Sequence, residues 1–212
     1  MSSKADLTQE RILSSARKEF LQAGFHNASM RRIASEANVT TGAVYRYFAD
    51  KDTLFQEATK DAVHALHNLY SNMTDIAFDE LEAGNTYDRN RSMANLTELF
   101  EVVYEYFDQF YLLVMCSKDS IQESFLHKIV EEETACTLEY LERLKKQIGS
   151  DYEIDKTGLH IVIEAFVSAL LEPVRHRMSK EEAMKHIVFI GNFFADGWAG
   201  VEGELTRTET KK

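Results

Sequence analysis

The sequence predicts an all-α protein with a small helical head at its amino end and a larger helical body behind it. The chain of 212 residues contains only one proline and nine glycines, which favours long helices over a fold rich in turns. Hydrophobic residues make up 44% of the chain, enough for a packed core and too many for a disordered protein. Apolar residues also recur at helical spacing in most long segments.

The first helix is expected from about Leu7 to Ala23, with Asp6 as its amino-terminal cap. Gly24 follows, and glycine tolerates the left-handed conformation that commonly ends a helix. The buried face of this helix is expected to consist of apolar residues at helical spacing: Ile12, Leu13, Ala16 and Phe20.

Two short helices joined by a tight turn are predicted by the segment that follows. Ser29 can cap the first, Asn38 tolerates the left-handed conformation at its end, and Thr40 can cap the second. Val44 and Phe48 lie one turn apart in the second helix and are expected to point into the core. Two short helices that meet at such a turn form a helix-turn-helix, whose second helix enters the DNA major groove.

A long fourth helix is expected from Lys51 to about Phe78, with Asp50 as its cap. Lys51 would lie in the first turn, where free backbone amides and the helix dipole favour a phosphate group. The polar stretch 79–91 contains a Gly-Asn pair and predicts a loop within the body.

Four more helical segments are expected in the body. Pro173 would bend the third of them near its end. The last two segments are hydrophobic over more of their surface than one core contact needs, which indicates a second partner. The four segments are Ser92–Met115, Ile121–Gln147, Lys156–Arg177 and Lys180–Val201.

The charge is unevenly distributed along the chain. The formal net charge is −11, but basic residues exceed acidic residues by two within residues 1–60, so the remainder carries −13. A mildly basic head on an acidic body is consistent with a protein that contacts DNA at one end only. The small basic surplus predicts modest non-specific affinity for DNA, because that affinity comes from neutralised phosphates.

The sequence gives no sign of secretion, membrane insertion or catalysis. Cys116 and Cys136 lie in apolar helical contexts without a CxxC motif, and are expected to be reduced thiols of a cytosolic protein. No apolar run reaches 18 residues, so no membrane span is expected. His64 and His67 could share a helix face, but two solvated histidines are favoured over a metal pair. We expect no enzyme activity, catalytic residue, metal or cofactor.

The segment from Arg11 to Phe55 closely resembles the amino-terminal DNA-binding domain of the TetR family of bacterial transcriptional regulators. The resemblance covers about the first quarter of the chain and implies a homeodomain-like head of three helices. The matching residues stand at fixed spacing without a gap: Ile12, Leu13, Ala16, Phe20, Gly24, Phe25, Ser29, Ile33, Ala34, Ala37, Val39, Gly42, Tyr45, Tyr47, Phe48, Lys51, Leu54 and Phe55.

The resemblance implies a DNA-binding head at residues 1–52 and an effector-binding, dimer-forming body at residues 53–212. It also implies a homodimer on a palindromic double-stranded DNA operator, repression as the default, and control by a small molecule that moves the fourth helix. Such a protein would work in the bacterial cytoplasm, associated with the nucleoid. The alternative is a helical sensor or adaptor protein that no longer binds DNA.

Ten residues of the head are candidates for DNA contact. Threonine can bond a base or pack on a thymine methyl group, and Gly42 permits close approach of the backbone. Tyr45 and Tyr47 resemble phosphate-contacting positions of the family, although Tyr45 could equally lie in the core. Arg46 could reach a base or a phosphate, and Lys51 a phosphate. The full set is Ser29, Arg31, Thr40, Thr41, Gly42, Ala43, Tyr45, Arg46, Tyr47 and Lys51.

Candidates in the body are of two kinds. For the effector site they are Tyr104, Phe107, Tyr111 and Glu164, where the aromatic residues could instead be core and Glu164 could lie on a solvated face. Glu131, Glu132 and Glu133 are expected to form a solvated turn of helix. For the dimer interface, the candidates lie on the last two helices: Phe166, Leu170, Ile187, Ile190, Phe194 and Trp198.

Overall fold

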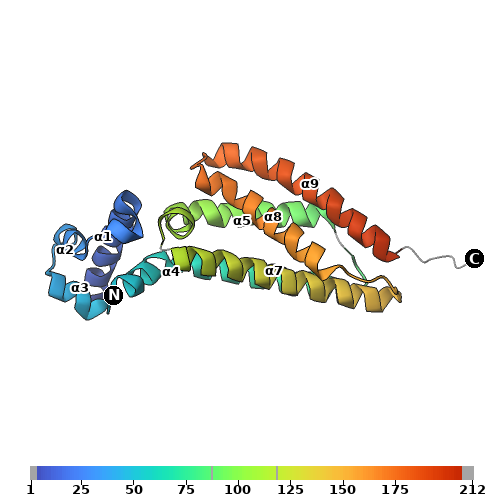
Figure 1. The fold of residues 1–212 in the computed structure, drawn as a ribbon, viewed down its shortest axis with the longest axis horizontal. Coiled ribbons are helices and arrows are strands. Elements are labelled where there is room, and N and C mark those ends of the chain that lie inside the picture. Colours follow the sequence, from blue (N-terminus) through green and yellow to red (C-terminus); the bar gives the residue numbers. More distant parts are fainter. Residues whose placement is uncertain (1–3, 87, 118, 207–212) are drawn as a thin grey trace, which may run out of the picture. The chain divides into compact units, whose positions relative to one another are not determined.

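The computed structural model describes residues 4–86, 88–117 and 119–206, and every regular element in these ranges is a helix (Figure 1). The predicted all-α fold is therefore confirmed. In chain order the elements are α1 (Lys4–Asn27), α2 (Met30–Glu36), α3 (Thr41–Tyr47), α4 (Lys51–Glu82), α5 (Arg89–Glu105), α6 (Phe107–Tyr111), the π-helix η1 (Leu112–Cys116), α7 (Asp119–Ile148), α8 (Lys156–Arg175) and α9 (Lys180–Thr206).

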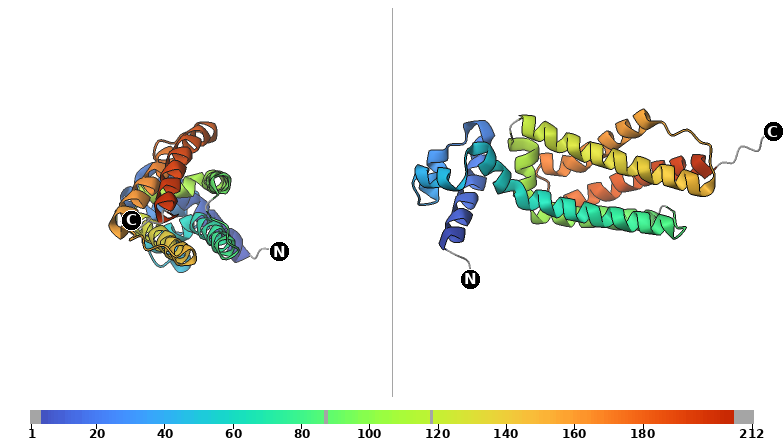
Figure 2. Two further views of the ribbon diagram at one scale, coloured as in Figure 1. Left: turned by 90° about the vertical axis from the view of Figure 1, so that its right-hand side faces the viewer. Right: turned by 90° about the horizontal axis from the view of Figure 1, so that it is seen from below.

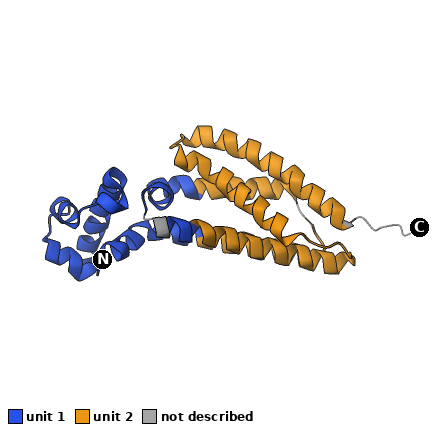
Figure 3. Cartoon of the chain, in the orientation of Figure 1, with its two compact units in different colours: residues 1–66, 102–125 blue, residues 67–101, 126–212 orange. Residues whose placement is uncertain are grey.

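The chain divides into two compact units (Figure 3). Unit 1 consists of Met1–Leu66 and Val102–Phe125, and unit 2 consists of His67–Glu101 and Leu126–Lys212. Unit 1 thus contains the helix-turn-helix, the first part of α4, and a segment that comes much later in the sequence. The long helices α4 and α7 each contribute to both units.

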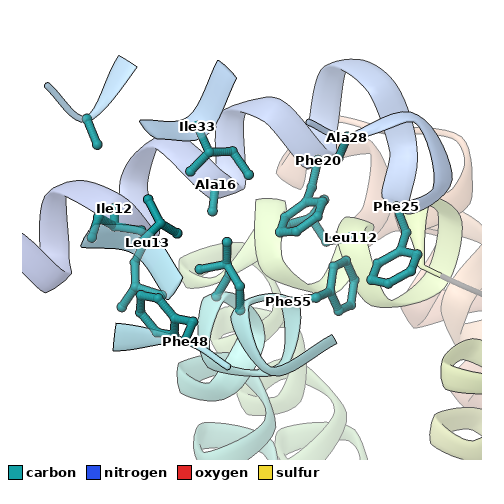
Figure 4. Close-up of a cluster of buried hydrophobic side chains, with 14 of the residues drawn as sticks. Ile12, Leu13, Ala16, Phe20, Phe25, Ala28, Ile33, Phe48, Phe55 and Leu112 are labelled. Atoms are coloured by element: carbon teal, nitrogen blue, oxygen red, sulfur yellow. The ribbon is translucent and has the colours of Figure 1, made fainter. Parts of the chain in front are cut away.

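The core of unit 1 is built around aromatic rings of α1 and α4 (Figure 4). The ring of Phe55 lies 5.0 Å from that of Phe20 and 5.5 Å from that of Phe25, edge-on in both cases. Leu112 of η1 completes this cluster and is fully buried. The predicted buried face of the first helix is confirmed, because each of its members is less than 9% exposed: Ile12, Leu13, Ala16 and Phe20.

Gly24 interrupts the helical geometry of α1, as its position in the sequence predicts. Its backbone has φ 70° and ψ 168°, which is outside the helical region, and a further turn then runs to Asn27. This break brings Phe25 into the core, where it is 5% exposed. Glycine is suited to this place because the left-handed region is costly for residues that carry a Cβ atom.

The helix predicted for residues 92–115 is divided into α5, α6 and η1. The backbone of Tyr106 has φ −110° and ψ 30°, which ends α5, and the π-helical turn begins six residues later. Three consecutive apolar residues of η1, Leu112, Leu113 and Val114, are each at most 4% exposed. The wider π-helical turn allows this run to be buried, and periodicity alone does not reveal it.

Unit 2 is a set of long helices packed side by side (Figures 1 and 2). Ion pairs Arg89–Asp196 and Glu101–Lys180 show that α5 and α9 run antiparallel. The core contains apolar side chains of α4, α7, α8 and α9, with Ile163 fully buried. The predicted loop is shorter than expected, since α4 ends at Glu82 and α5 begins at Arg89, and residue 87 lies outside the described residues.

Helix α8 is long and apolar enough to cross a membrane by length and composition alone, with a mean hydropathy of 1.4 over an 18-residue window. It is the one helix of the described residues with this property. Its inner face packs in the core of unit 2 through Leu159, Ile163 and Val167. A core helix of a water-soluble protein has the same composition, so this property does not overturn the expectation that the chain lacks a membrane span.

Candidate nucleic-acid interface

Local hydrogen bonds fix the helix-turn-helix of unit 1 in the predicted way. The hydroxyl oxygen of Ser29 accepts a hydrogen bond from the Arg32 amide at 3.4 Å, and that of Thr40 accepts one from the Ala43 amide at 3.1 Å. Asn38 has φ 53° and so takes the left-handed conformation at the turn. Each cap satisfies an amide that has no partner within its own helix. The two predicted caps and the predicted turn residue are confirmed.

Glu19 of α1 holds the start of α2 in place, a role that the sequence did not suggest. Its Oε1 accepts hydrogen bonds from the Ser29 amide at 2.8 Å and from Arg32 Nε at 2.8 Å. A second guanidinium nitrogen, Arg32 Nη2, lies 2.5 Å from the same oxygen. The hydrogen bond from Arg32 is the main reason that the pKa of Glu19 is lowered. Arg32 is thereby committed to positioning α2.

The outer face of α3 carries the predicted base-reading and phosphate-binding side chains. Thr40, Gly42, Tyr45 and Arg46 are exposed, whereas Val44 on the opposite face is fully buried. Tyr45 is 49% exposed, so it does not belong to the core, which was the alternative left open by its sequence. The rest of the predicted set on this segment, Thr41, Ala43 and Tyr47, is half-buried.

Gly42 is not required by the fold. A Cβ atom placed there would meet Thr40 Oγ1 at 4.0 Å and nothing nearer, and the backbone conformation does not demand glycine. Arg46 lies beside this open spot on α3, with its guanidinium carbon 5.6 Å from the centre of the Tyr47 ring. A glycine with open space above it on an exposed helix allows close approach of a bulky partner.

Lys51 lies at the start of α4, but its ammonium group is engaged within the chain. Its Nζ donates to the carbonyl oxygens of His26 at 3.1 Å and Ala28 at 3.4 Å, and it lies 4.8 Å from the centre of the Phe25 ring. The side chain therefore joins the end of α1 to the start of α4. Asp50 caps α4 as predicted, since its Oδ1 accepts the Thr53 amide at 2.7 Å.

In unit 1, two side chains from other helices also form hydrogen bonds with the backbone of one turn of α4. The Ala58 carbonyl oxygen accepts a hydrogen bond from Arg17 Nε at 2.8 Å, and the Ala62 amide donates to Gln109 Oε1 at 3.1 Å. Asp61 joins the two side chains, with Oδ2 at 3.2 Å from Arg17 and 3.4 Å from Gln109. Since Gln109 is only 7% exposed, it ties α6 to α4 from inside the core.

The four predicted effector residues do not share one compact unit. Tyr104, Phe107 and Tyr111 belong to unit 1, where their half-buried rings form a row with centroids 5.1 Å and 6.5 Å apart. Glu164 belongs to α8 in unit 2 and is exposed. A role for these residues in binding an effector stays a prediction.

The structure differs from the predicted dimer residues at one position. Ile187 is 1% exposed and packs inside its own chain, so it cannot offer surface to a partner. The remaining five are half-buried: Phe166, Leu170, Ile190, Phe194 and Trp198. Five other apolar residues of α8 and α9, which the sequence did not single out, are 44–74% exposed: Ile161, Val162, Val188, Phe189 and Phe193.

Glu133 is a second correction. It was expected on a solvated turn with Glu131 and Glu132, and these two are indeed exposed, but Glu133 is directed into unit 2, where burial raises its pKa. The signal lay in the spacing of the helix, because Glu133 is three residues after Val130 and eight before Leu141, both of which are buried. Over the described ranges, no group of three potential metal ligands occurs.

Comparisons with known proteins agree with this arrangement. Residues 12–58 match the model described as bacterial regulatory proteins of the tetR family. The HTH-type transcriptional regulator UidR of Escherichia coli K12 is 39% identical over 56 residues, which are 26% of this chain and 29% of UidR. The match thus spans less than a third of that relative. The HTH-type transcriptional repressor AcnR of Corynebacterium diphtheriae is 23% identical over 173 residues, 77% of this chain and 81% of AcnR.

Solved structures show the same fold over most of the chain. NalD of Pseudomonas aeruginosa, described as the secondary repressor of the MexAB-OprM multidrug efflux pump, aligns with a TM-score of 0.61 at 16% identity, covering 89% of this chain and 96% of NalD. A putative TetR-family regulator of Syntrophomonas wolfei aligns with a TM-score of 0.60 at 19% identity, covering 89% and 94%. Residues 12–58 thus match the tetR family model, and the chain as a whole shares the fold of solved TetR-like regulators.

Proposed function

We propose that the protein is a sequence-specific DNA-binding regulator of transcription, a repressor that acts as a homodimer in the bacterial cytoplasm on nucleoid DNA. The observation that carries this proposal is the outer face of α3, where Thr40, Gly42, Tyr45 and Arg46 are exposed together. Helices of this kind place such side chains in the major groove, with one recognition helix for each half-site.

The distribution of ion pairs in unit 1 supports this proposal. Lys18 pairs with Glu36 and Arg32 pairs with Glu19, so these cations are partly neutralised within the chain. Within the described residues, the exposed Arg31 and Arg46 form no ion pair. They are available to DNA phosphates or base edges, and phosphate contacts would fix the register of the head on the duplex.

The homodimer is supported by the apolar outer face of α8 and α9. Phe189 is 74% exposed, Phe193 69% and Ile161 59%. Large apolar side chains gathered at this exposure are typical of surfaces that bind another protein. Two recognition helices related by a two-fold axis would read a palindromic operator, with half-sites one helical turn of about 34–36 Å, or a multiple of it, apart.

Control by a small molecule completes the proposal. The body, residues 53–212, would hold the effector, and its binding would be coupled with opposite sign to DNA binding. Candidate contacts are the aromatic row Tyr104, Phe107 and Tyr111, and Glu164. The names of two relatives, the repressors AcnR and NalD, support repression rather than activation. No catalytic role is proposed.

A mobility-shift measurement on DNA from the protein's own promoter tests the proposal. We expect salt-sensitive, sequence-specific binding, and Arg46→Ala should lower the affinity about tenfold or more, as loss of a base or phosphate contact costs about 1–3 kcal/mol. Lys146→Ala, at an exposed position of α7, is the matched control and should bind like the wild type. Absence of binding even at low salt would favour the alternative, a helical sensor or adaptor that does not bind DNA.

The homodimer has its own test. Phe189→Asp and Phe193→Asp each place a charge on the apolar face and should shift the protein to monomer in sedimentation velocity. Ile148→Asp makes the same change at an exposed position of α7 and should leave the dimer intact. A wild-type protein that sediments as a monomer would contradict this part of the proposal.

A further inference from the structure

Polar side chains of three helices meet inside unit 2. Tyr70 and Thr74 come from α4, and Thr74 Oγ1 lies 3.8 Å from Cys136 Sγ of α7. On α7, Thr137 donates to Glu133 Oε1 at 3.5 Å. His160 of α8 reaches the same region, with Nδ1 at 3.4 Å from Thr134 Oγ1 of α7. The polar cluster of unit 2 is this set: Tyr70, Thr74, Glu133, Thr134, Cys136, Thr137 and His160.

Glu133 is the only acid of the polar cluster. Tyr70 lies near Glu133, and its hydroxyl group donates to the neighbouring carbonyl oxygen of Glu132 at 3.4 Å. Thr137 donates a hydrogen bond to Glu133 Oε1 at 3.5 Å, and over the described ranges no Lys, Arg or His side chain forms an ion pair with Glu133. Its exposed neighbours on α7 do have such partners, since Glu131 pairs with His127 and Glu132 with Lys128. On α7 the exposed carboxylates of Glu131 and Glu132 therefore have basic partners, whereas Glu133 has none among the described residues.

Glu133 is half-buried, and burial is the main reason that the pKa of its carboxyl group is raised. The other six residues of the polar cluster are also half-buried. Apolar residues of the same helices, such as Val130, Leu141 and Ile163, are buried by contrast. The polar cluster therefore keeps accessible surface that the apolar core does not.

A buried carboxyl group without a counter-charge costs stability, and an apolar side chain or an amide of similar size would avoid that cost. Perturbed acids inside a helical bundle are candidates for binding sites, because the missing charge can come from a ligand. The hydroxyl groups of Tyr70, Thr74, Thr134 and Thr137 would orient such a ligand by hydrogen bonds. These groups come from α4 and α7, and His160 adds a side chain from α8.

We infer that the polar cluster binds a small organic amine, whose ammonium group pairs with the carboxylate of Glu133. This inference rests on the proposed regulator and deepens it, because it assigns the chemical class of the effector and moves the charged contact from Glu164 to Glu133. An ammonium group pairs with the ionised form of Glu133, and a side chain that holds its proton would release it to solvent on binding while the amine stays protonated. Because burial raises the pKa of Glu133, the amine affinity should rise as the pH rises through that pKa.

Three other titratable groups belong to the polar cluster. The pKa of Tyr70 on α4 is raised, mainly by burial and also by the charge of Glu133. Cys136 lies on α7 beside Tyr70, and His160 of α8 reaches the polar cluster through Thr134.

Calorimetric titration of the full-length protein without DNA tests the inference. The probes are butylamine, hexylamine and 2-phenylethylamine, each compared with the alcohol of the same carbon skeleton. For the wild type we expect at least one amine to bind at least about tenfold more tightly than its alcohol, and to bind more tightly at pH 8 than at pH 6. In Glu133→Gln the preference and the pH dependence should disappear. They should persist in the control Glu131→Gln, at an exposed position of the same helix.

Three results would overturn the inference: equal binding of amine and alcohol, an amine preference retained by Glu133→Gln, or no binding of any of the three amines at millimolar concentration. Circular dichroism and the urea midpoint of each variant would show that it is folded. Since operator binding is measured separately, loss of amine binding with intact DNA binding removes this inference alone. Loss of DNA binding would instead remove the proposed regulator.

Discussion

Glu19 of unit 1 and Glu133 of unit 2 are both carboxyl groups withdrawn from solvent, and their surroundings differ. Glu19 accepts hydrogen bonds from Arg32 and from a backbone amide, which lower its pKa. Glu133 accepts a hydrogen bond from Thr137 but has no ion-pair partner within the described residues, and burial raises its pKa. In unit 1 the charge of the carboxylate is balanced within the chain, which suits a rigid surface for the proposed DNA binding. In unit 2, by our inference, the charge of the carboxylate is balanced only when a ligand supplies a cation.

The largest effect is expected from Glu19→Ala. This change leaves the Ser29 amide without its acceptor and releases Arg32, so the free energy of unfolding should fall by about 1–3 kcal/mol, the range for hydrogen bonds to charged groups. Urea unfolding followed by circular dichroism measures it. Glu36→Ala removes an exposed pair with Lys18 and is the control, with an expected change under about 0.5 kcal/mol. Equal losses in the two variants would contradict the role of Glu19.

The two carboxyl groups should also give opposite pH dependences. The folded pKa of Glu19 lies below the unfolded value of about 4.3, so its contribution is full above that pH and is lost as the pH falls through the folded pKa. The folded pKa of Glu133 lies above the unfolded value, so the unfolded chain loses its proton first. Its contribution therefore declines as the pH rises from about 4.3 towards the folded pKa.

The variant Glu133→Gln tests the pH dependence of stability that is expected for Glu133. The variant should be more stable than the wild type at pH 7.5, by roughly 1 kcal/mol or a rise in the melting temperature of about 2–4 °C. At about pH 3.5 most of that gain should vanish, because the side chain then holds its proton in most folded and most unfolded wild-type chains. Glu164→Gln, on the exposed side of α8, should show no such difference. A gain independent of pH would mean that Glu133 is ionised in the folded protein.

Most of the contacts in this comparison could not be predicted from the sequence, because the residues that form them lie far apart along the chain. The caps Ser29, Thr40 and Asp50 were predicted correctly, because each contact spans three residues and depends on local chemistry. The Glu19–Arg32 pair spans 13 residues, and the contact between Ala62 and Gln109 spans 47, so no local pattern indicates either. Such contacts follow from packing, which a single sequence does not display.

Errors on the body helices have a different origin. In a helix three consecutive residues point in directions about 100° apart, so a run of three glutamates cannot share one solvated face. Composition alone predicts that all three glutamates are solvated, whereas the helical spacing from the buried Val130 predicts that Glu133 faces inward. For Ile187 the difficulty is the opposite one, because it was predicted at the surface and is buried. Its helix is apolar on most sides, so the sequence pattern does not indicate which side faces the core.

Gln109→Leu tests whether the hydrogen bonds of the buried Gln109 side chain also stabilise unit 1. The change removes the acceptor of the Ala62 amide and the donor to Asp61, and should lower the free energy of unfolding by about 1 kcal/mol. Hydrogen exchange should show faster exchange of the Ala62 amide. Gln22→Leu, at an exposed position of α1, should change neither quantity. An unchanged Ala62 amide would indicate that its helical hydrogen bond suffices.

The smallest effect is expected for a hydroxyl group of the polar cluster. Thr137→Val keeps the shape of the side chain but removes a hydrogen bond to Glu133 that is long at 3.5 Å, so the free energy of unfolding should change by less than about 0.5 kcal/mol. Thr40→Ala, which removes the shorter cap at 3.1 Å in unit 1, should cost about 1 kcal/mol. If Thr137→Val proved the more costly of the two, the polar interior of unit 2 would be as complete as that of unit 1. The carboxyl group of Glu133 would then have no need of a charge from a ligand.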